Sequence, residues 1–75
     1  MNFVAIDVET ANPNMGSICQ IGIARFAEGE LVDEWVSLVD PEEYFDAVNT
    51  SIHGIDQSIV QGKPKLPELA QKLHE

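Results

Sequence analysis

The hydrophobic residues of this chain form three strand-like stretches, followed by a helical pattern near its end. The stretches rich in β-branched and other apolar residues are Phe3–Thr10, Ser17–Phe26 and Leu31–Val39, and each is predicted to be a strand. Glu28-Gly29 lies between the last two, where glycine takes a positive φ without steric cost and a short connection enforces antiparallel pairing. The sequence therefore predicts a β-hairpin in the middle of the chain.

The remainder of the chain is predicted to consist of loops and helices. Asn, Pro and Gly are concentrated at residues 11–16, which predicts a connecting loop, and residues 41–49 fit either a loop or a short helix. Asp56 is placed to cap a short helix over Gln57–Val60. Apolar residues at helical spacing over residues 66–73 predict an amphipathic helix with a sheet to cover. This order predicts the front part of a domain with an α-plus-β opening.

Two carboxylates interrupt the first predicted strand. Side chains alternate across a strand, so Asp7 and Glu9 share one face, with Cα atoms roughly 6 to 7 Å apart. Four consecutive apolar residues precede Asp7 and predict a strand that is buried on both faces. The acids would then emerge at its carboxyl end, where α/β sheets commonly place ligands. Two like charges held side by side in this way require a cation.

The acidic pair has two alternative interpretations besides a magnesium or manganese site. Asp7 and Glu9 could decorate the solvent face of an ordinary edge strand, as most acidic residues do. An EF-hand-like calcium loop fails, because Ala11, Asn12 and Ile18 would occupy its fifth, sixth and twelfth positions in place of a ligand, a glycine and a glutamate. An octahedral magnesium or manganese site suits two carboxylates better, because these ions keep water and substrate phosphate as further ligands.

Composition limits the function classes without deciding among them. The chain has 75 residues and a formal net charge of −9, with 4 Lys and Arg against 13 Asp and Glu, which argues against a generic nucleic-acid-binding module. Divalent ions can nevertheless bring a phosphodiester to an acidic site. Cys19 is the single cysteine, and no basic, apolar leader follows Met1, so the expected location is the cytoplasm, with no membrane partner.

Three motifs together resemble a known family. They are Phe3-Val4-Ala5-Ile6-Asp7-Val8-Glu9-Thr10, Ile18-Cys19-Gln20-Ile21-Gly22 and Ile52-His53-Gly54-Ile55. The chain is similar in these motifs to the 3′-5′ exonucleases with an Asp-Glu-Asp-Asp-His active site, which include the epsilon proofreading subunit of DNA polymerase III, ribonuclease T and oligoribonuclease. The resemblance implies an α/β, ribonuclease-H-like fold, represented here by its first three strands, as an antiparallel meander, and the helices that follow.

The resemblance covers only the N-terminal part of the family domain, so residues 1–75 are expected to be the first portion of a single exonuclease domain. The family continues with an Asn-x-x-Phe-Asp element that carries a third carboxylate, and later with a histidine and a further aspartate. These three signature residues have no counterpart here. The isolated chain is therefore expected to be an incomplete site, although its parent is expected to be an enzyme.

Residue roles follow from the same resemblance. Asp7 would bridge two divalent ions, Mg²⁺ or Mn²⁺, and Glu9 would hold one of them, while the missing histidine would deprotonate the attacking water. Thr10 and His53 would contact the 3′-terminal nucleotide; the alternative for His53 is a capped or solvated side chain. His74 is expected at the surface.

The implied activity is metal-dependent hydrolysis of phosphodiester bonds at the 3′ ends of DNA, of a proofreading or repair type, with a two-metal mechanism. One alternative is an exoribonuclease of the same family that trims RNA. Another is a catalytically silent fragment or interaction module, because three signature residues are missing. Expected partners are nucleic-acid 3′ ends and polymerase subunits, and the unfinished sheet could pair with a second copy of the chain.

Overall fold

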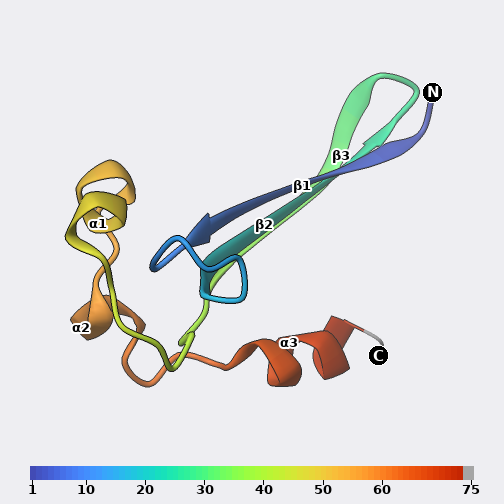
Figure 1. The fold of residues 1–75 in the computed structure, drawn as a ribbon. Coiled ribbons are helices and arrows are strands. Elements are labelled where there is room, and N and C mark those ends of the chain that lie inside the picture. Colours follow the sequence, from blue (N-terminus) through green and yellow to red (C-terminus); the bar gives the residue numbers. More distant parts are fainter. Residues whose placement is uncertain (74–75) are drawn as a thin grey trace.

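A computed structural model describes the backbone of residues 1–73 and the side chains of residues 1–69, so His74 lies outside the described residues. The elements follow one another as three strands and three helices (Figure 1). They are β1 (Phe3–Thr10), β2 (Ile18–Ala27), β3 (Glu30–Leu38), α1 (Ala47–His53), α2 (Gln57–Val60) and α3 (Leu66–Leu73). The predicted strands and the last two predicted helices are confirmed, with boundaries that differ by at most one residue.

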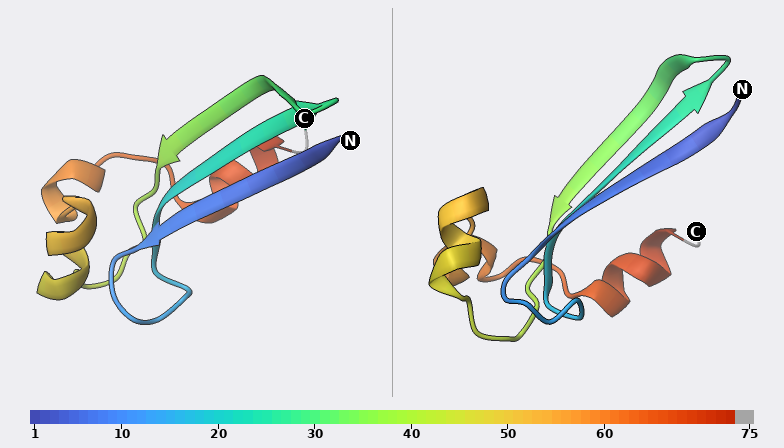
Figure 2. Two further views of the ribbon diagram at one scale, coloured as in Figure 1. Left: turned by 90° about the horizontal axis from the view of Figure 1, so that it is seen from above. Right: turned by 45° about the horizontal axis from the view of Figure 1, so that its top comes forward.

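The three strands form one antiparallel sheet in the order β1-β2-β3, so the predicted meander is confirmed. The turn between β2 and β3 places both Glu28 and Gly29 at positive φ, 54° and 82°. Two successive positive φ values match the right-handed twist of the flanking strands. The strands run side by side as a long, twisted arm that extends away from α1 and α2 (Figure 2).

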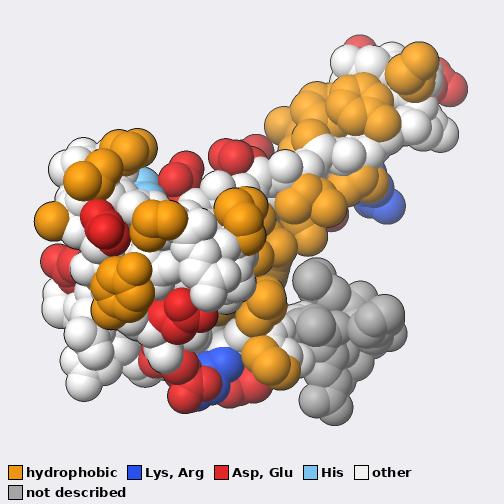
Figure 3. Space-filling model, viewed as in Figure 1, with side chains coloured by type: hydrophobic (Ala, Val, Ile, Leu, Met, Phe, Trp, Pro, Cys, Tyr) orange, Lys and Arg blue, Asp and Glu red, His pale blue; other side chains and the backbone are white. Residues whose placement is uncertain are grey.

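The prediction that the first strand is buried on both faces is wrong in this structure. β1 lies at an edge of the described sheet, and Val4 and Ile6 are more than half exposed, as is Val36 on β3. A strand at the edge is paired along one side only, and no described element covers the outer part of its apolar face. Apolar side chains consequently line the arm at the molecular surface (Figure 3).

The buried residues gather at the opposite end of the sheet, where the helices lie. Ala11, Cys19, Ile55 and Val60 form one buried cluster, and Leu38 and Phe45 are among the half-buried residues packed against it. In Figure 1 α1 and α2 sit beyond the ends of β1 and β2, and α3 runs back beneath the sheet. The core of this chain is therefore small and lies next to the carboxyl end of β1. Among the described residues, no helix has the length and apolar character of a membrane span.

Short-range capping fixes the ends of the helices. Residues 41–49 divide into a loop and the start of α1, because Asp46 accepts a hydrogen bond from the backbone N–H of Val48 and so begins the helix. Gly54 ends α1 in the left-handed conformation, with φ of 75°. Asp56 accepts from the N–H of Ile59 and caps α2, as the sequence predicts. The caps at Asp46, Gly54 and Asp56 thus set the limits of two short helices beside the end of the sheet.

Candidate active site

Asp7 and Glu9 project from one face of β1, as their spacing predicts. In the register of the sheet, Asp7 lies opposite Gly22 and Glu9 lies opposite Gln20 on β2. Directly paired residues of antiparallel strands present their side chains on the same face. Asp7 is exposed and Glu9 is half-buried, so both carboxylates stay accessible to a ligand from solvent.

Gly22 leaves free space beside Asp7. A Cβ atom added at this glycine would lie 3.6 Å from the Cγ2 atom of Val36 and 3.9 Å from the backbone oxygen of Asp7, both ordinary contact distances. The position is therefore not restricted to glycine by a clash. The absence of a side chain at Gly22 leaves a depression in the sheet surface between β1 and β3, next to the carboxylate of Asp7.

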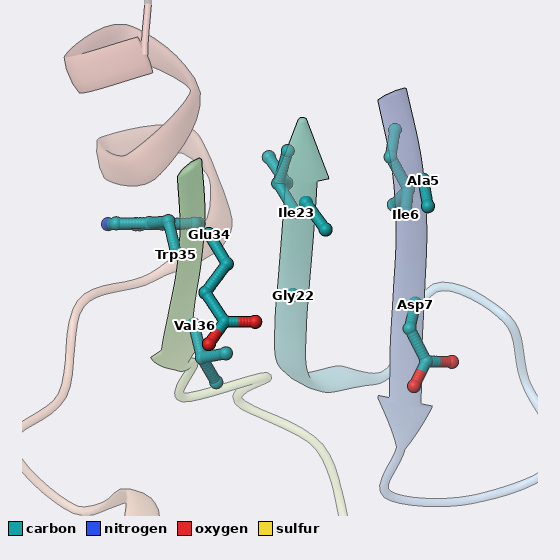
Figure 4. Close-up of a pocket in the computed structure, with 9 residues that line it drawn as sticks. Ala5, Ile6, Asp7, Gly22, Ile23, Glu34, Trp35 and Val36 are labelled. Carbon is teal, nitrogen blue, oxygen red and sulfur yellow. The ribbon is translucent and has the colours of Figure 1, made fainter. Parts of the chain in front are cut away.

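A shallow hollow of about 250 Å³ occupies this part of the sheet. It is bordered by Asp7 on β1 and Glu34 on β3, which lie on either side of Gly22 on β2 (Figure 4). Ala5 and Ala24 contribute further small side chains to its lining. The hollow reaches the predicted site at Asp7 only, while Glu9 lies closer to the helical end of the sheet.

The donor set fits a hard divalent cation but supplies only part of its shell. Asp7 and Glu9 offer carboxylate oxygens, the ligands that Mg²⁺ and Mn²⁺ prefer. Arg25 lies opposite Val4 in the register and therefore on the other face of the sheet from the acids. Within residues 1–69, no group of three His, Cys, Asp or Glu side chains is close enough to hold a metal ion. Two carboxylates thus need water, substrate oxygens or further protein ligands to complete the coordination.

Thr10 is held at the end of β1 by two side chains of α1. Its carbonyl oxygen accepts from Nε2 of His53 at 2.8 Å and from Nδ2 of Asn49 at 3.3 Å. The same Nδ2 atom lies 3.3 Å from the Thr10 hydroxyl oxygen. The pairing register shifts between Glu9 and Thr10, and such an irregularity changes the direction of the side chains beyond it.

Both ring nitrogens of His53 are engaged within the chain. Nδ1 accepts from the backbone N–H of Ile55 at 3.0 Å, so the ring proton lies on Nε2, which donates to the carbonyl of Thr10. The Cys19 sulfur lies 3.9 Å from Nε2. The ring faces and carbon edges are the parts of His53 left for a ligand, and its substrate contact stays a prediction.

Cys19 is a buried free thiol at the base of this site. Burial raises the pKa of its thiol, and the nearby negative charge of Glu9 raises it further, although a backbone hydrogen bond acts in the opposite direction. A raised pKa keeps the thiol protonated and unreactive near neutral pH. Cys19 is therefore a packing residue of the buried cluster, in agreement with its place beside Ala11.

The loop after β1 is anchored by buried polar residues. Asn12 is 1% exposed, and its amide donates to the carbonyl of Tyr44 at 2.9 Å and to Glu43 at 3.3 Å. Its own Oδ1 accepts from the N–H of Asn14, and the fully buried Ser17 hydroxyl lies 3.1 Å from its backbone N–H. The chain that follows Glu9 and Thr10 is thus fixed rather than free.

Sequence analysis missed Asn12 and Asn49 as parts of the site. Asn12 lies in a stretch rich in turn-forming residues, so its burial had no local signal. Asn49 and His53 are four residues apart, which places them on one face of a helix, but this spacing was informative only once α1 was known. Glu34 was missed too, because only the strand register places it near Asp7.

The comparisons with known proteins agree with this geometry. Residues 4–75 match the family described as exonuclease, RNase_T, which is nearly the whole chain. The chain belongs to this exonuclease family. The structure also matches Exonuclease X in complex with 5′ overhanging duplex DNA, with a TM-score of 0.84 and 26% identity, over 93% of this chain and 42% of that one. The expected ribonuclease-H-like exonuclease fold is therefore confirmed.

Curated relatives of this exonuclease chain include two kinds of polymerase III protein. It is 31% identical to a DNA polymerase III PolC-type protein of Clostridium perfringens over 75 residues, or 97% of this chain and 5% of that protein. It is 32% identical to a DNA polymerase III subunit epsilon-like protein of Rhodobacter capsulatus over 79 residues, or 99% of this chain and 11% of that protein. The exonuclease chain thus spans only a small part of these relatives.

Proposed function

We propose that residues 1–75 are the N-terminal portion of a single exonuclease domain that removes nucleotides from the 3′ ends of DNA. The observation that carries this proposal is the pair Asp7 and Glu9, which share one face of β1 beside the open position at Gly22. An accessible acidic pair at the end of a strand suits a two-metal phosphodiesterase, in which paired ions stabilise the attacking and leaving oxygens.

Each residue of the site has a separate task in this proposal. Asp7 would bridge two ions, Mg²⁺ or Mn²⁺, and Glu9 would hold one of them. Bound ions of this kind supply the Lewis acidity that activates a water molecule and neutralises charge at phosphorus. Thr10 and His53 would contact the 3′-terminal nucleotide and orient it. A third carboxylate, a histidine that accepts the proton of the water and a last aspartate would come from beyond these residues.

DNA is the favoured substrate class, and RNA is the alternative. One solved structure that resembles this chain is a complex of Exonuclease X with 5′ overhanging duplex DNA, and the curated relatives named above carry the name of a DNA polymerase. These names support a role in proofreading or repair, with polymerase subunits as partners. We propose the cytoplasm as the location, because the buried free thiol of Cys19 suits a reducing compartment. Self-association through the open edge of β1 also stays a proposal.

The decisive experiment removes the first carboxylate. In the complete protein with Mg²⁺ or Mn²⁺, a 5′-labelled single strand is expected to shorten from its 3′ end. Asp7→Ala is expected to abolish this shortening, because no other described residue supplies the bridging ligand. Asp33→Ala is the matched control: Asp33 is an exposed residue on β3 that lies opposite Arg25 in the strand register, and the variant should leave the rate unchanged. Equal activity of Asp7→Ala and the wild type would contradict the assignment.

The chain by itself has a second candidate function, as a silent fragment or interaction module. It is favoured by the absence of a three-ligand group among residues 1–69. Titration of the 75-residue chain with Mn²⁺ separates the two cases. Micromolar binding that is lost in Asp7→Ala would indicate a partly formed metal site, whereas no binding would support the silent module.

A further inference from the structure

We propose that Asn49 turns the Thr10 hydroxyl into a hydrogen-bond donor for the substrate, and that Asn49 and His53 together act as positioning residues that hold the Thr10 backbone. This inference rests on the proposed exonuclease function and adds to it the groups that set the orientation of Thr10. Asn49 and His53 lie on α1, 39 and 43 residues from Thr10 in sequence, and both reach its backbone carbonyl.

The orientation of the Asn49 amide follows from the chemistry of its partner. A backbone carbonyl oxygen can only accept hydrogen bonds, so the atom of Asn49 that faces the Thr10 carbonyl at 3.3 Å must be the amide nitrogen. That same nitrogen lies 3.3 Å from the Thr10 hydroxyl oxygen. An amide NH₂ group donates and does not accept, so the hydroxyl oxygen is the acceptor in this contact.

The hydroxyl proton of Thr10 is consequently left available. A threonine hydroxyl has one proton to donate and two lone pairs to accept with, and Asn49 occupies one lone pair. A ligand that offers an acceptor oxygen, such as the 3′ oxygen or a phosphate oxygen of a nucleotide, can then take the proton. Asn49 thus favours one of the two hydrogen-bonding roles of Thr10 before any ligand arrives.

His53 holds the backbone carbonyl of Thr10, which Asn49 also contacts. Because Nδ1 accepts from the Ile55 N–H, the proton on Nε2 points at the Thr10 carbonyl over 2.8 Å. Asn49 and His53 are four residues apart, so their side chains share the face of α1 that holds Thr10. The backbone N–H of Asp46, at the start of the helix, holds Ala11 by donating to its carbonyl at 2.7 Å.

Apolar packing of α1 does not account for how this helix is held. Val48 and Ile52 are strongly exposed, so few apolar contacts hold this helix in place. α1 is instead tied to the end of β1 through polar groups that converge on Thr10 and Ala11. Such an arrangement transmits the position of α1 to the residue next to Glu9.

A double-mutant cycle tests whether Asn49 acts through the Thr10 hydroxyl. In the complete protein, kcat and KM for shortening of a 5′-labelled strand are measured for Asn49→Ala, Thr10→Val and the double variant. Each single variant is expected to raise KM by about 3- to 10-fold, the range of one hydrogen bond, and the double variant by no more than either alone. Effects that multiply would overturn the inference. Ser51→Ala, whose exposed hydroxyl contacts only Val48 of the same helix, is the matched control.

A binding measurement provides a readout that does not depend on turnover. A deoxynucleoside 5′-monophosphate with Mg²⁺ is titrated into the wild type and the same variants, and Kd is expected to follow the KM pattern. His53→Gln keeps a donor near the Thr10 carbonyl and should bind better than His53→Leu, which has none. Long-range ¹⁵N–¹H spectra should show the proton of His53 on Nε2. Absence of saturable binding in the wild type, or a proton on Nδ1, would overturn the inference.

Failure of this inference is distinguishable from failure of the proposed function. If Asp7→Ala is inactive while the Asn49 and Thr10 effects multiply, the exonuclease assignment stands and the positioning role is wrong. If Asp7→Ala is as active as the wild type, the assignment itself is wrong, whatever the cycle shows.

Discussion

The two ends of the sheet are built in opposite ways. At the helical end, buried polar and apolar residues interlock: Asn12 and Ser17 are buried with their hydrogen bonds satisfied, next to the cluster around Cys19. At the hairpin end, Phe3 stacks on Phe26 with ring centroids 4.6 Å apart, but most apolar side chains there face solvent. The same three strands therefore run from an ordered base to an uncovered arm.

This difference between the two ends bears on the residues of the candidate active site. Glu9 and Thr10 lie at the ordered end, where side chains from a distant segment bind Thr10, and Asp7 lies where the buried end of the sheet gives way to the arm. Sites that bind ions or substrate work best when a second layer of contacts holds their ligands in place. Among the described residues, no second layer of contacts of this kind covers the exposed apolar arm. Stability measurements at matched positions in the two ends of the sheet test this difference.

The largest expected difference is between two isoleucines. Ile55 is 6% exposed in the buried cluster, whereas Ile6 is 65% exposed on the arm. Ile55→Ala is expected to lower the free energy of unfolding by about 2–5 kcal/mol, because it leaves a cavity. Ile6→Ala should cost less than about 1 kcal/mol, mainly through the lower strand preference of alanine. Urea unfolding followed by circular dichroism gives both values, and equal costs would mean that another surface covers the arm in solution.

The next contrast uses two asparagines whose side chains each accept a hydrogen bond from a backbone N–H. Asn12 is buried and bonds to Tyr44 and Asn14, while the exposed Asn2 accepts from the N–H of Glu28 at the hairpin end. Asn12→Ala should lower the free energy of unfolding by about 1–3 kcal/mol, because buried groups lose their partners. Asn2→Ala should change it by less than about 0.5 kcal/mol. Similar shifts of the urea midpoint in both variants would contradict the claim that the helical end of the sheet is more ordered than the hairpin end.

Local sequence patterns predicted most of the fold, because strand preference, turn conformation and helix capping depend on residues that are close together in the sequence. The strands follow from runs of β-branched residues, the hairpin from Glu28-Gly29 and α2 from its cap at Asp56, and all three are present in the structure. The acidic pair on one face of β1 follows from alternation alone. These features depend on residues that are close together in the sequence, so one chain is enough to find them.

The rest depended on contacts between distant segments. Asn49 and His53 reach Thr10 across about 40 positions, and no periodic pattern announces such a pairing. The apolar run at Phe3–Ile6 predicted burial on both faces, but burial depends on which elements cover the strand, and the described ones cover only its other end. Sequence patterns thus located the carboxylates of the candidate site, whereas the groups that position the adjacent Thr10 became visible only in three dimensions.

The smallest expected effect concerns pH at the cap of α2, a helix that carries Val60 into the buried cluster. Hydrogen bonds from the Ser58 hydroxyl and the Ile59 N–H lower the pKa of Asp56 below its usual 3.8. A folded-state pKa below the unfolded one means that the ionised cap stabilises the fold above pH 3.8 and loses this effect as the pH falls through the lower, folded value. The difference in urea midpoint between the wild type and Asp56→Ala should therefore be constant near neutral pH and shrink in strong acid. Asp56→Asn, which caps without titrating, should keep its advantage over Asp56→Ala across the same range. A wild-type advantage that persists unchanged in acid would show that ionisation of Asp56 does not help to hold α2 at the ordered end of the sheet.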